Sequence, residues 1–276
     1  MPQETALQSE PAWTPSQLDN PHVDPEKARR VEKMFAAIAP SYDLNNRVHS
    51  FGRDQAWRRA AVKMAELRPG DRVLDVACGT GDLTFAFAAE LGRINGPRSL
   101  TTGQVTGLDF TEEMLAIARQ KSSAPPTDSD SPLVPFLHGD AMALPLPDAS
   151  VDVVSIAFGI RNVAEPARAL AEFYRVLRPG GRLIVLEFTV PTNPVFRLGY
   201  NFYCGWLMPR TASLIARDTS GAYKYLPRSV NTFAGKSELI SAMSDAGFLR
   251  VTIRELTCGI AACYRGFKTE TAAARG

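Results

Sequence analysis

Two glycines, Gly79 and Gly81, stand one residue apart, just after a short apolar run that contains a carboxylate, Asp75. A segment with helical spacing begins at Asp82, so the order is strand, glycine-rich turn, helix. In open α/β sheets such a turn lies at the carboxyl end of a strand, where nucleotide-like ligands bind. A side chain at either glycine would obstruct the tight turn and the close approach of a ligand. The spacing predicts that Gly79, Thr80 and Gly81 contact a cofactor.

The position three residues after the second glycine separates two classes of cofactor. A dinucleotide fold expects a third glycine there, for helix–strand packing and room around a pyrophosphate. This chain has Thr84, which argues against NAD. Asp75, four residues before Gly79, suits a positively charged amino-acid group better than a pyrophosphate.

Acids also follow the next two predicted strands. Asp109 ends the second strand, and its two oxygens can accept both hydroxyls of a ribose; the alternative is a helix cap ahead of Thr111. Asp140 and Ala141 follow the third strand, where a side-chain oxygen and an adjoining backbone N–H match the edge of adenine. Ribose and adenine contacts without a phosphate site indicate S-adenosylmethionine.

The elements that must position these residues alternate along the chain. Short apolar runs alternate with helical spacing, which predicts an α/β fold with a parallel sheet covered on both faces. Two further strands near the end are joined by so short a turn that they must be antiparallel. The expected strands are residues 72–77, 104–108, 133–137, 151–156, 182–187, 249–255 and 260–267, and the expected helices are 24–39, 54–67, 82–91, 111–121, 165–177 and 236–246.

Composition changes mark the expected domain limits. Residues 1–23 are polar and proline-rich, which predicts a disordered lead-in. Residues 24–268 form the expected single domain, with a helical lid inserted around 194–235, and 269–276 a flexible tail. Residues 92–103 and 122–132 are expected to be polar inserts.

Size, charge and cysteine usage exclude several classes. The 276 residues carry a net charge of +2 without a basic stripe, which argues against a nucleic-acid partner. The pair Arg58-Arg59 is interpreted as a solvated helix face. Four cysteines without a CxxC pair and three scattered histidines argue against a metal site and for reduced thiols in the cytoplasm. We expect no secretory signal in residues 1–25 and no membrane-spanning helix.

Taken together, the motifs resemble a class I S-adenosylmethionine-dependent methyltransferase. The finer resemblance is to the C-methyltransferases of menaquinone and ubiquinone biosynthesis, and it runs from about Val31 to Lys268. It implies a Rossmann-like, seven-stranded, mostly parallel sheet with an antiparallel last strand. A small departure is Ala157, where some members carry serine. The matching stretches are residues 35–43, 45–46, 50–52 with Trp57, 75–82, 107–109, 138–141, 158–163, 178–181, 186–188, 223–226 with 229–230, and 265–268.

The resemblance implies methyl transfer to a ring carbon of a polyprenylated hydroquinone. Demethylmenaquinol is the first-choice substrate, 2-methoxy-6-polyprenyl-1,4-benzoquinol the alternative, and an NAD-dependent oxidoreductase a more distant one. Arg161 would stabilise a phenolate or orient a water, against the simpler interpretation of a surface salt bridge with Glu165. Asn162 would fix a ring hydroxyl. The resemblance also implies substrate contacts by Phe158, Glu187 and Tyr225, and closure over the cofactor by Tyr42.

The aromatic segment 196–208 has two interpretations that we combine: lid core, and an apolar trough for a prenyl tail. The second implies a peripheral membrane contact at the inner face, with Arg197, Arg210 and Arg217 facing anionic headgroups. The sequence leaves open the tail length, the proton acceptor, and whether the chain forms a homodimer.

Overall fold

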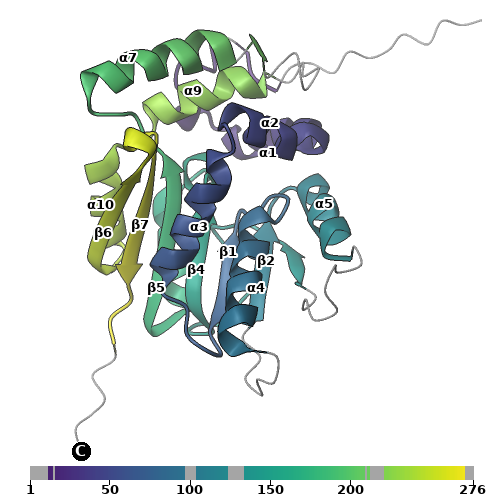
Figure 1. Ribbon diagram of the computed structural model, residues 1–276, viewed down its shortest axis with the longest axis vertical. Coiled ribbons are helices and arrows are strands. Elements are labelled where there is room, and N and C mark those ends of the chain that lie inside the picture. The colour runs from purple at the N-terminus through teal and green to yellow at the C-terminus, as the bar shows by residue number, and fades with distance from the viewer. Residues whose placement is uncertain are drawn as a thin grey trace, which may run out of the picture.

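A seven-stranded sheet crosses the computed structural model (Figure 1), which describes residues 12–14, 16–96, 104–123, 134–208, 210–211 and 221–270. Within these residues the strand order is β3-β2-β1-β4-β5-β7-β6. Strand β7 is antiparallel to both of its neighbours, and the other pairs are parallel. The predicted fold class is confirmed. The strands are β1 Arg72–Val76, β2 Gln104–Asp109, β3 Phe136–His138, β4 Val151–Ala157, β5 Leu177–Phe188, β6 Leu249–Leu256 and β7 Ala261–Phe267.

Alternation along the strands builds one apolar core on each face of the sheet. Leu74 and Val76 pack toward α6 and α10, whereas Val73 packs toward α3 and α4. Neighbouring side chains of a strand point to opposite faces, so an uninterrupted apolar strand needs helices on both. The helices outside the lid are α1 Lys27–Ile38, α2 Tyr42–His49, α3 Arg53–Ala65, α4 Asp82–Asn95, α5 Glu112–Ser123, α6 Pro166–Val176 and α10 Lys236–Asp245.

Two element boundaries in particular differ from the expected ones: the end of α4 and the start of β5. Helix α4 continues into the expected polar insert and ends at Gly96, whose φ of +72° suits a helix C-terminus. Strand β5 begins at Leu177 rather than at residue 182, and the expected turn around Gly180 lies within it as a break in register.

Helix α2 was not predicted, because its polarity is inverted. Leu44 and Val48 are exposed on it, whereas Asn45 is buried. Hydrophobic spacing indicates a helix only when the apolar side faces the core. It lies between the sheet edge and the lid (Figure 1). Its first turn is hydrogen-bonded to the glycine turn and its last residue to the lid.

The expected disordered lead-in is wrong for residues 12–14 and 16–23. Trp13 is only 3% exposed and stacks on Tyr225, with ring centroids 4.9 Å apart. His22 Nε2 bonds the carbonyl of Ser229 at 2.8 Å, so it is the imidazole that donates. The folded unit therefore begins upstream of residue 24. Residues 1–11 of the expected lead-in, 97–103 and 124–132 of the expected inserts 92–103 and 122–132, and 271–276 of the expected tail 269–276 lie outside the described residues.

The lid crosses the edge where the parallel strands end (Figure 1). It comprises α7 Pro194–Phe202, a π-helical turn at Tyr203–Leu207 and α9 Ala222–Thr232. Helix α7 starts sharply because the Asn193 side chain accepts the N–H groups of Val195 and Phe196, with Pro194 at the first position. Residues 212–220, including Arg217, lie outside the described part of the chain.

Candidate active site

The two turn glycines meet different constraints. Gly81 has φ +88°, and a Cβ there would lie 2.8 Å from Phe85 and 3.1 Å from Phe136. Its role is packing between α4 and β3. Gly79 has φ +56° and lines a pocket at the sheet edge, where a Cβ would meet only Tyr42, at 3.9 Å. Of the two, Gly79 faces the ligand space.

This sheet-edge pocket gathers residues from four strand ends and from α1. Asp109, Asp140, Ala141, Phe158 and Asn162 line it. Helix α1 and the start of α2 cover it through Ala28, Val31, Phe35 and Tyr42.

Asp109 serves as a loop anchor and as a pocket wall at once. Its Oδ2 accepts the Gly79 N–H at 2.7 Å, and its Oδ1 accepts the Thr111 N–H at 2.8 Å. Asp109 therefore caps the segment that starts at Thr111, which was the alternative interpretation, and also lines the pocket. In the pocket, the carboxylate can accept hydroxyl donors. Burial raises the pKa of Asp109.

Asp140 lies one strand further along the same wall. Its Oδ1 accepts the Met142 N–H at 2.8 Å, which fixes the loop after β3. Gly139 precedes it, and a Cβ there would lie 3.0 Å from Leu108. The loop is thus held against the sheet with Asp140 and Ala141 at the pocket.

Asp75 lies beneath the turn rather than in the pocket. It is 1% exposed, and its oxygens accept the hydroxyls of Thr84 and Ser155, both at 2.6 Å. Burial raises its pKa to about 6 against the opposing effect of these hydroxyls. Thr84, read in the sequence as a missing glycine, therefore supports this carboxylate.

Thr80 also points away from the pocket. Its hydroxyl donates to Asp43 Oδ1 of α2 at 2.6 Å, and the residue is 3% exposed. Thr80, Gly81 and Asp75 are thus brought near the pocket without lining it.

A second, apolar cavity of about 610 Å³ lies between α2, α3 and the lid. Tyr225 of α9 and Tyr200 of α7 line it, together with Phe188 at the end of β5. Three of its residues also line the sheet-edge pocket: Phe35, Tyr42 and Phe158. The polar pocket and the apolar cavity therefore adjoin.

Arg161 belongs to a buried ion pair at the wall of the apolar cavity. It is 4% exposed, and its Nη1 lies 2.5 Å from Glu187 Oε1 and 2.7 Å from the Phe158 carbonyl. The surface salt bridge with Glu165 is wrong, since Glu165 is exposed and lies 3.9 Å from Arg168 instead. Glu187 does not line the cavity, and it holds Arg161 in place. Burial raises the pKa of Glu187, although Arg161 opposes the shift.

Asn162 bridges the two compartments from the position next to Arg161. Its Nδ2 donates to the Phe158 carbonyl at 3.1 Å, and its Oδ1 accepts the Tyr225 hydroxyl at 2.9 Å. Burial raises the pKa of Tyr225, so this phenol stays neutral. Phe158 itself has φ +56°, which turns the chain sharply after β4.

Sequence reasoning missed a polar group on α2 and α3. Asn46, His49, Asp54 and Arg58 line the apolar cavity. Arg58 is 7% exposed and donates to Asp54 at 2.9 Å, so the solvated-face interpretation is wrong for this residue. The i,i+4 spacing of Asp54 and Arg58 was the available signal.

No three His, Cys, Asp or Glu side chains of the described residues form a group that could hold a metal ion. Likewise, none of the helices in the described part of the chain is long and apolar enough to cross a membrane.

The strand order, the antiparallel β7 and the acids along one crevice define a class I methyltransferase fold. Solved structures agree: a SAM-dependent methyltransferase of Thermotoga maritima, a possible histamine N-methyltransferase, has a TM-score of 0.57 at 24% identity, covering 87% of this chain and 100% of that one. The [4+2]-cyclase SpnF has a TM-score of 0.60 at 17% identity, covering 88% and 97%. Likeness at this level shows the fold alone, since one fold hosts different chemistries.

Sequence comparison is more specific. The demethylmenaquinone methyltransferases of Bacillus cereus (strain AH187) and Bacillus anthracis are each 40% identical over 245 residues, covering 89% of this chain and 98% of the relative. The model of the ubiE/COQ5 methyltransferase family matches residues 23–268, and the chain belongs to this family.

Proposed function

We propose that this enzyme transfers a methyl group from S-adenosylmethionine to a ring carbon of a polyprenylated hydroquinone, converting demethylmenaquinol to menaquinol. The observation that carries the proposal is the shared wall of Phe35, Tyr42 and Phe158 between a polar pocket and an apolar cavity. Donor and acceptor can meet only where two such compartments adjoin. The 40% identity to demethylmenaquinone methyltransferases supports the choice of acceptor.

The sheet-edge pocket fits the methyl donor. Asp109 would accept the ribose hydroxyls, and Asp140 with the Ala141 backbone would meet the adenine edge. Gly79 leaves room beside Tyr42 that a side chain would reduce. S-adenosylmethionine would supply an electrophilic methyl group on a sulfonium.

The apolar cavity fits the acceptor. Its volume of about 610 Å³ lies within the range of small-molecule sites, roughly 300–1,000 Å³. Aromatic and aliphatic side chains from α7 and α9 offer the surface that an isoprenoid needs. Closure by the lid excludes water, which strengthens electrostatic interactions inside.

The polar groups at the shared wall have distinct tasks. Arg161 stabilises a developing ring phenolate or orients the water that accepts the ring proton, because an arginine stays protonated. Glu187 fixes its guanidinium, and the Tyr225 hydroxyl fixes the amide of Asn162. Holding carbon and methyl in line supplies much of the rate.

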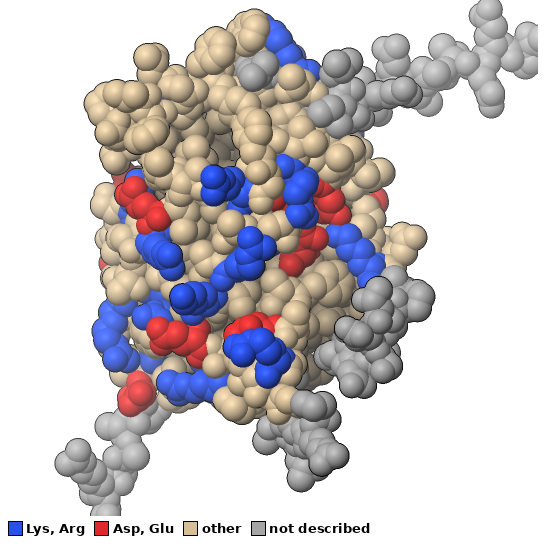
Figure 2. Space-filling model, in the orientation of Figure 1, with Lys and Arg blue, Asp and Glu red and all other residues tan. Residues whose placement is uncertain are grey.

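The outer face of the lid supports a proposed peripheral membrane contact. Val195, Leu198, Phe202 and Trp206 recur three or four residues apart and are 77%, 74%, 61% and 50% exposed. Figure 2 shows that charged side chains gather lower on the molecule, whereas the lid end of this face is mostly uncharged. Arg210 lies 4.7 Å above the Trp206 ring, so a cation borders the apolar row. A lipid surface fits this face and would hold the prenyl tail beside the cavity.

The test uses purified enzyme, labelled S-adenosylmethionine and chemically reduced acceptors. We expect labelled menaquinol from demethylmenaquinol, identified by mass spectrometry. Labelling of only 2-methoxy-6-polyprenyl-1,4-benzoquinol would move the assignment to ubiquinone synthesis. Thermal stabilisation by NADH but not by S-adenosylhomocysteine would overturn the methyltransferase proposal.

A further inference from the structure

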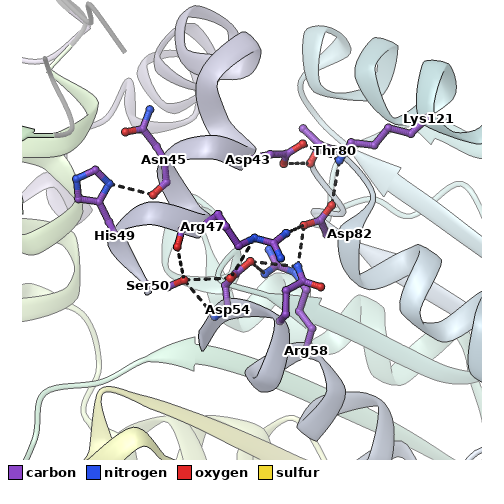
Figure 3. A network of polar contacts seen from close by, with 11 residues as sticks. Asp43, Asn45, Arg47, His49, Ser50, Asp54, Arg58, Thr80, Asp82 and Lys121 are labelled. Carbon is purple, nitrogen blue, oxygen red and sulfur yellow. Dashed lines mark hydrogen bonds and ion pairs between the residues drawn. The ribbon is translucent and has the colours of Figure 1, made fainter. Parts of the chain in front are cut away.

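Helix α2 lies across the glycine turn, and one acidic side chain fastens it there (Figure 3). Asp43 Oδ1 accepts the Thr80 hydroxyl at 2.6 Å, and its Oδ2 lies 2.6 Å from Lys121 Nζ of α5. Lys121 also pairs with Asp82 at 2.9 Å, at the start of α4. Asp43 thus joins α2 to the turn and to α5, and Lys121 extends the network to α4.

The residue next to Asp43 occupies the shared wall. Tyr42 lines the sheet-edge pocket and the apolar cavity, and its ring lies over Gly79. Asp43 lines neither compartment. Asp43 can therefore act on the reaction only through the residues it holds: Tyr42 and α2 on one side and the glycine turn on the other.

The opposite end of α2 is held by the lid. The Tyr203 hydroxyl donates to the His49 carbonyl at 2.9 Å, and His49 Nε2 lies 2.9 Å from the Thr211 hydroxyl. Arg47 also reaches Asp82, but at 3.7 Å and with its side chain 47% exposed. Asp43 makes the shorter contact at the cofactor end.

These contacts have a consequence for turnover. Helix α1 and Tyr42 line the sheet-edge pocket, so a movement of α1 and α2 changes the access of a methyl donor to it. We propose that Asp43 is a positioning residue: its contacts with Thr80 and Lys121 latch α2 over the bound cofactor and hold Tyr42 in its place in the shared wall. This inference rests on the proposed function only in that the pocket holds S-adenosylmethionine.

The experiment measures release of S-adenosylhomocysteine rather than methylation. Tritiated S-adenosylhomocysteine is bound to the full chain and chased with excess unlabelled compound. We expect Asp43→Asn and Thr80→Val each to raise the dissociation rate at least fivefold. Thr80→Ser, which keeps the hydroxyl, should have the wild-type dissociation rate. Glu90→Gln, an equivalent change in an exposed pair on α4 with Arg93, is the matched control and should leave it unchanged.

A double-variant cycle separates the latch from direct contact with the cofactor. If Asp43 and Thr80 act through each other, Asp43→Asn with Thr80→Val should release no faster than the faster single variant. Multiplying effects would show that Thr80 contacts the cofactor independently, and would overturn the proposal. If Asp43→Asn fails to fold, the nearly isosteric Thr80→Val carries the test.

Steady-state kinetics give the second measurement. With a quinol acceptor, Asp43→Asn should raise the KM for S-adenosylmethionine at least fivefold and the KM for the quinol less than twofold. Salt at 0.5 M should speed release from the wild type but not from Asp43→Asn, because screening weakens the Lys121 contact. Dissociation rates within twofold of the wild type in both single variants would overturn the latch. A wild-type enzyme that binds no S-adenosylhomocysteine would instead contradict the proposed function.

Discussion

Arg161 and Glu187 form an ion pair of 2.5 Å in which neither side chain is more than 5% exposed. Glu187 ends β5, whereas Arg161 lies on the short helical turn after β4, so adjacent parallel strands bring the two together. Lys27 and His22 lie close enough for Arg161 to lower the pKa of each, with burial as the main cause. Glu187 is thus the counter-charge of a locally cationic cluster.

Replacing Glu187 by Gln should leave the Arg161 charge buried and uncompensated. Loss of one partner of a buried pair costs about 3–5 kcal/mol, so we expect a large fall in the free energy of unfolding. Arg161→Ala should abolish methylation while keeping affinity for S-adenosylhomocysteine, because Arg161 lines the apolar cavity and not the sheet-edge pocket. Denaturant titration, calorimetric binding and turnover measure these effects. Glu165→Gln is the control and should change stability by less than about 0.5 kcal/mol; an equal loss there would contradict the assignment.

The raised pKa of Asp75 predicts a pH dependence of stability. The native carboxyl titrates at about 6 against 3.8 for its ordinary value, so the folded state binds more protons between these values. This group therefore makes stability fall as pH rises from about 4 to about 6. Asp75→Asn should remove that dependence and gain stability relative to wild type over the same window, by roughly 1–3 kcal/mol. Parallel unfolding curves at pH 4 and pH 7 with no relative change would contradict it.

The apolar row on the lid should govern membrane affinity. Leu198→Ser combined with Phe202→Ser removes two exposed side chains that line neither compartment. We expect less protein to float with anionic liposomes, while turnover of a short-chain acceptor in solution persists. Leu249→Ser, at an exposed site on the edge strand β6, is the control. A wild-type protein that stays wholly in the soluble fraction would show that this face has another role.

Trp13 precedes residue 24, the expected start of the domain, and we expect it to stabilise the lid. Trp13→Ala removes a buried ring stacked on Tyr225, which costs about 3–5 kcal/mol for a large core side chain. Its indole N–H has no partner among the described residues, so Trp13→Phe, which keeps an aromatic ring for the stack, should cost less than Trp13→Ala. Thermal unfolding of both variants gives the comparison. Equal melting temperatures for wild type and Trp13→Ala would show that the stack contributes nothing.

Local features of the chain were sufficient to predict the sheet, the glycine turn and the position of Asp109 and Asp140 at neighbouring strand ends. Strand periodicity, turn glycines and the convergence of parallel strand ends are short-range or follow from topology. These signals do not depend on which distant segment packs nearby.

Only the tertiary structure decided the partners of the polar side chains. Thr80 bonds Asp43 of α2, Arg161 pairs with Glu187 rather than the nearby Glu165, and Trp13 stacks on Tyr225 of α9. Helix α2 was missed for the same reason, since its buried side is polar. Such pairings depend on which surfaces meet after folding. The residues next to a polar side chain in the sequence do not indicate which distant partner it will contact.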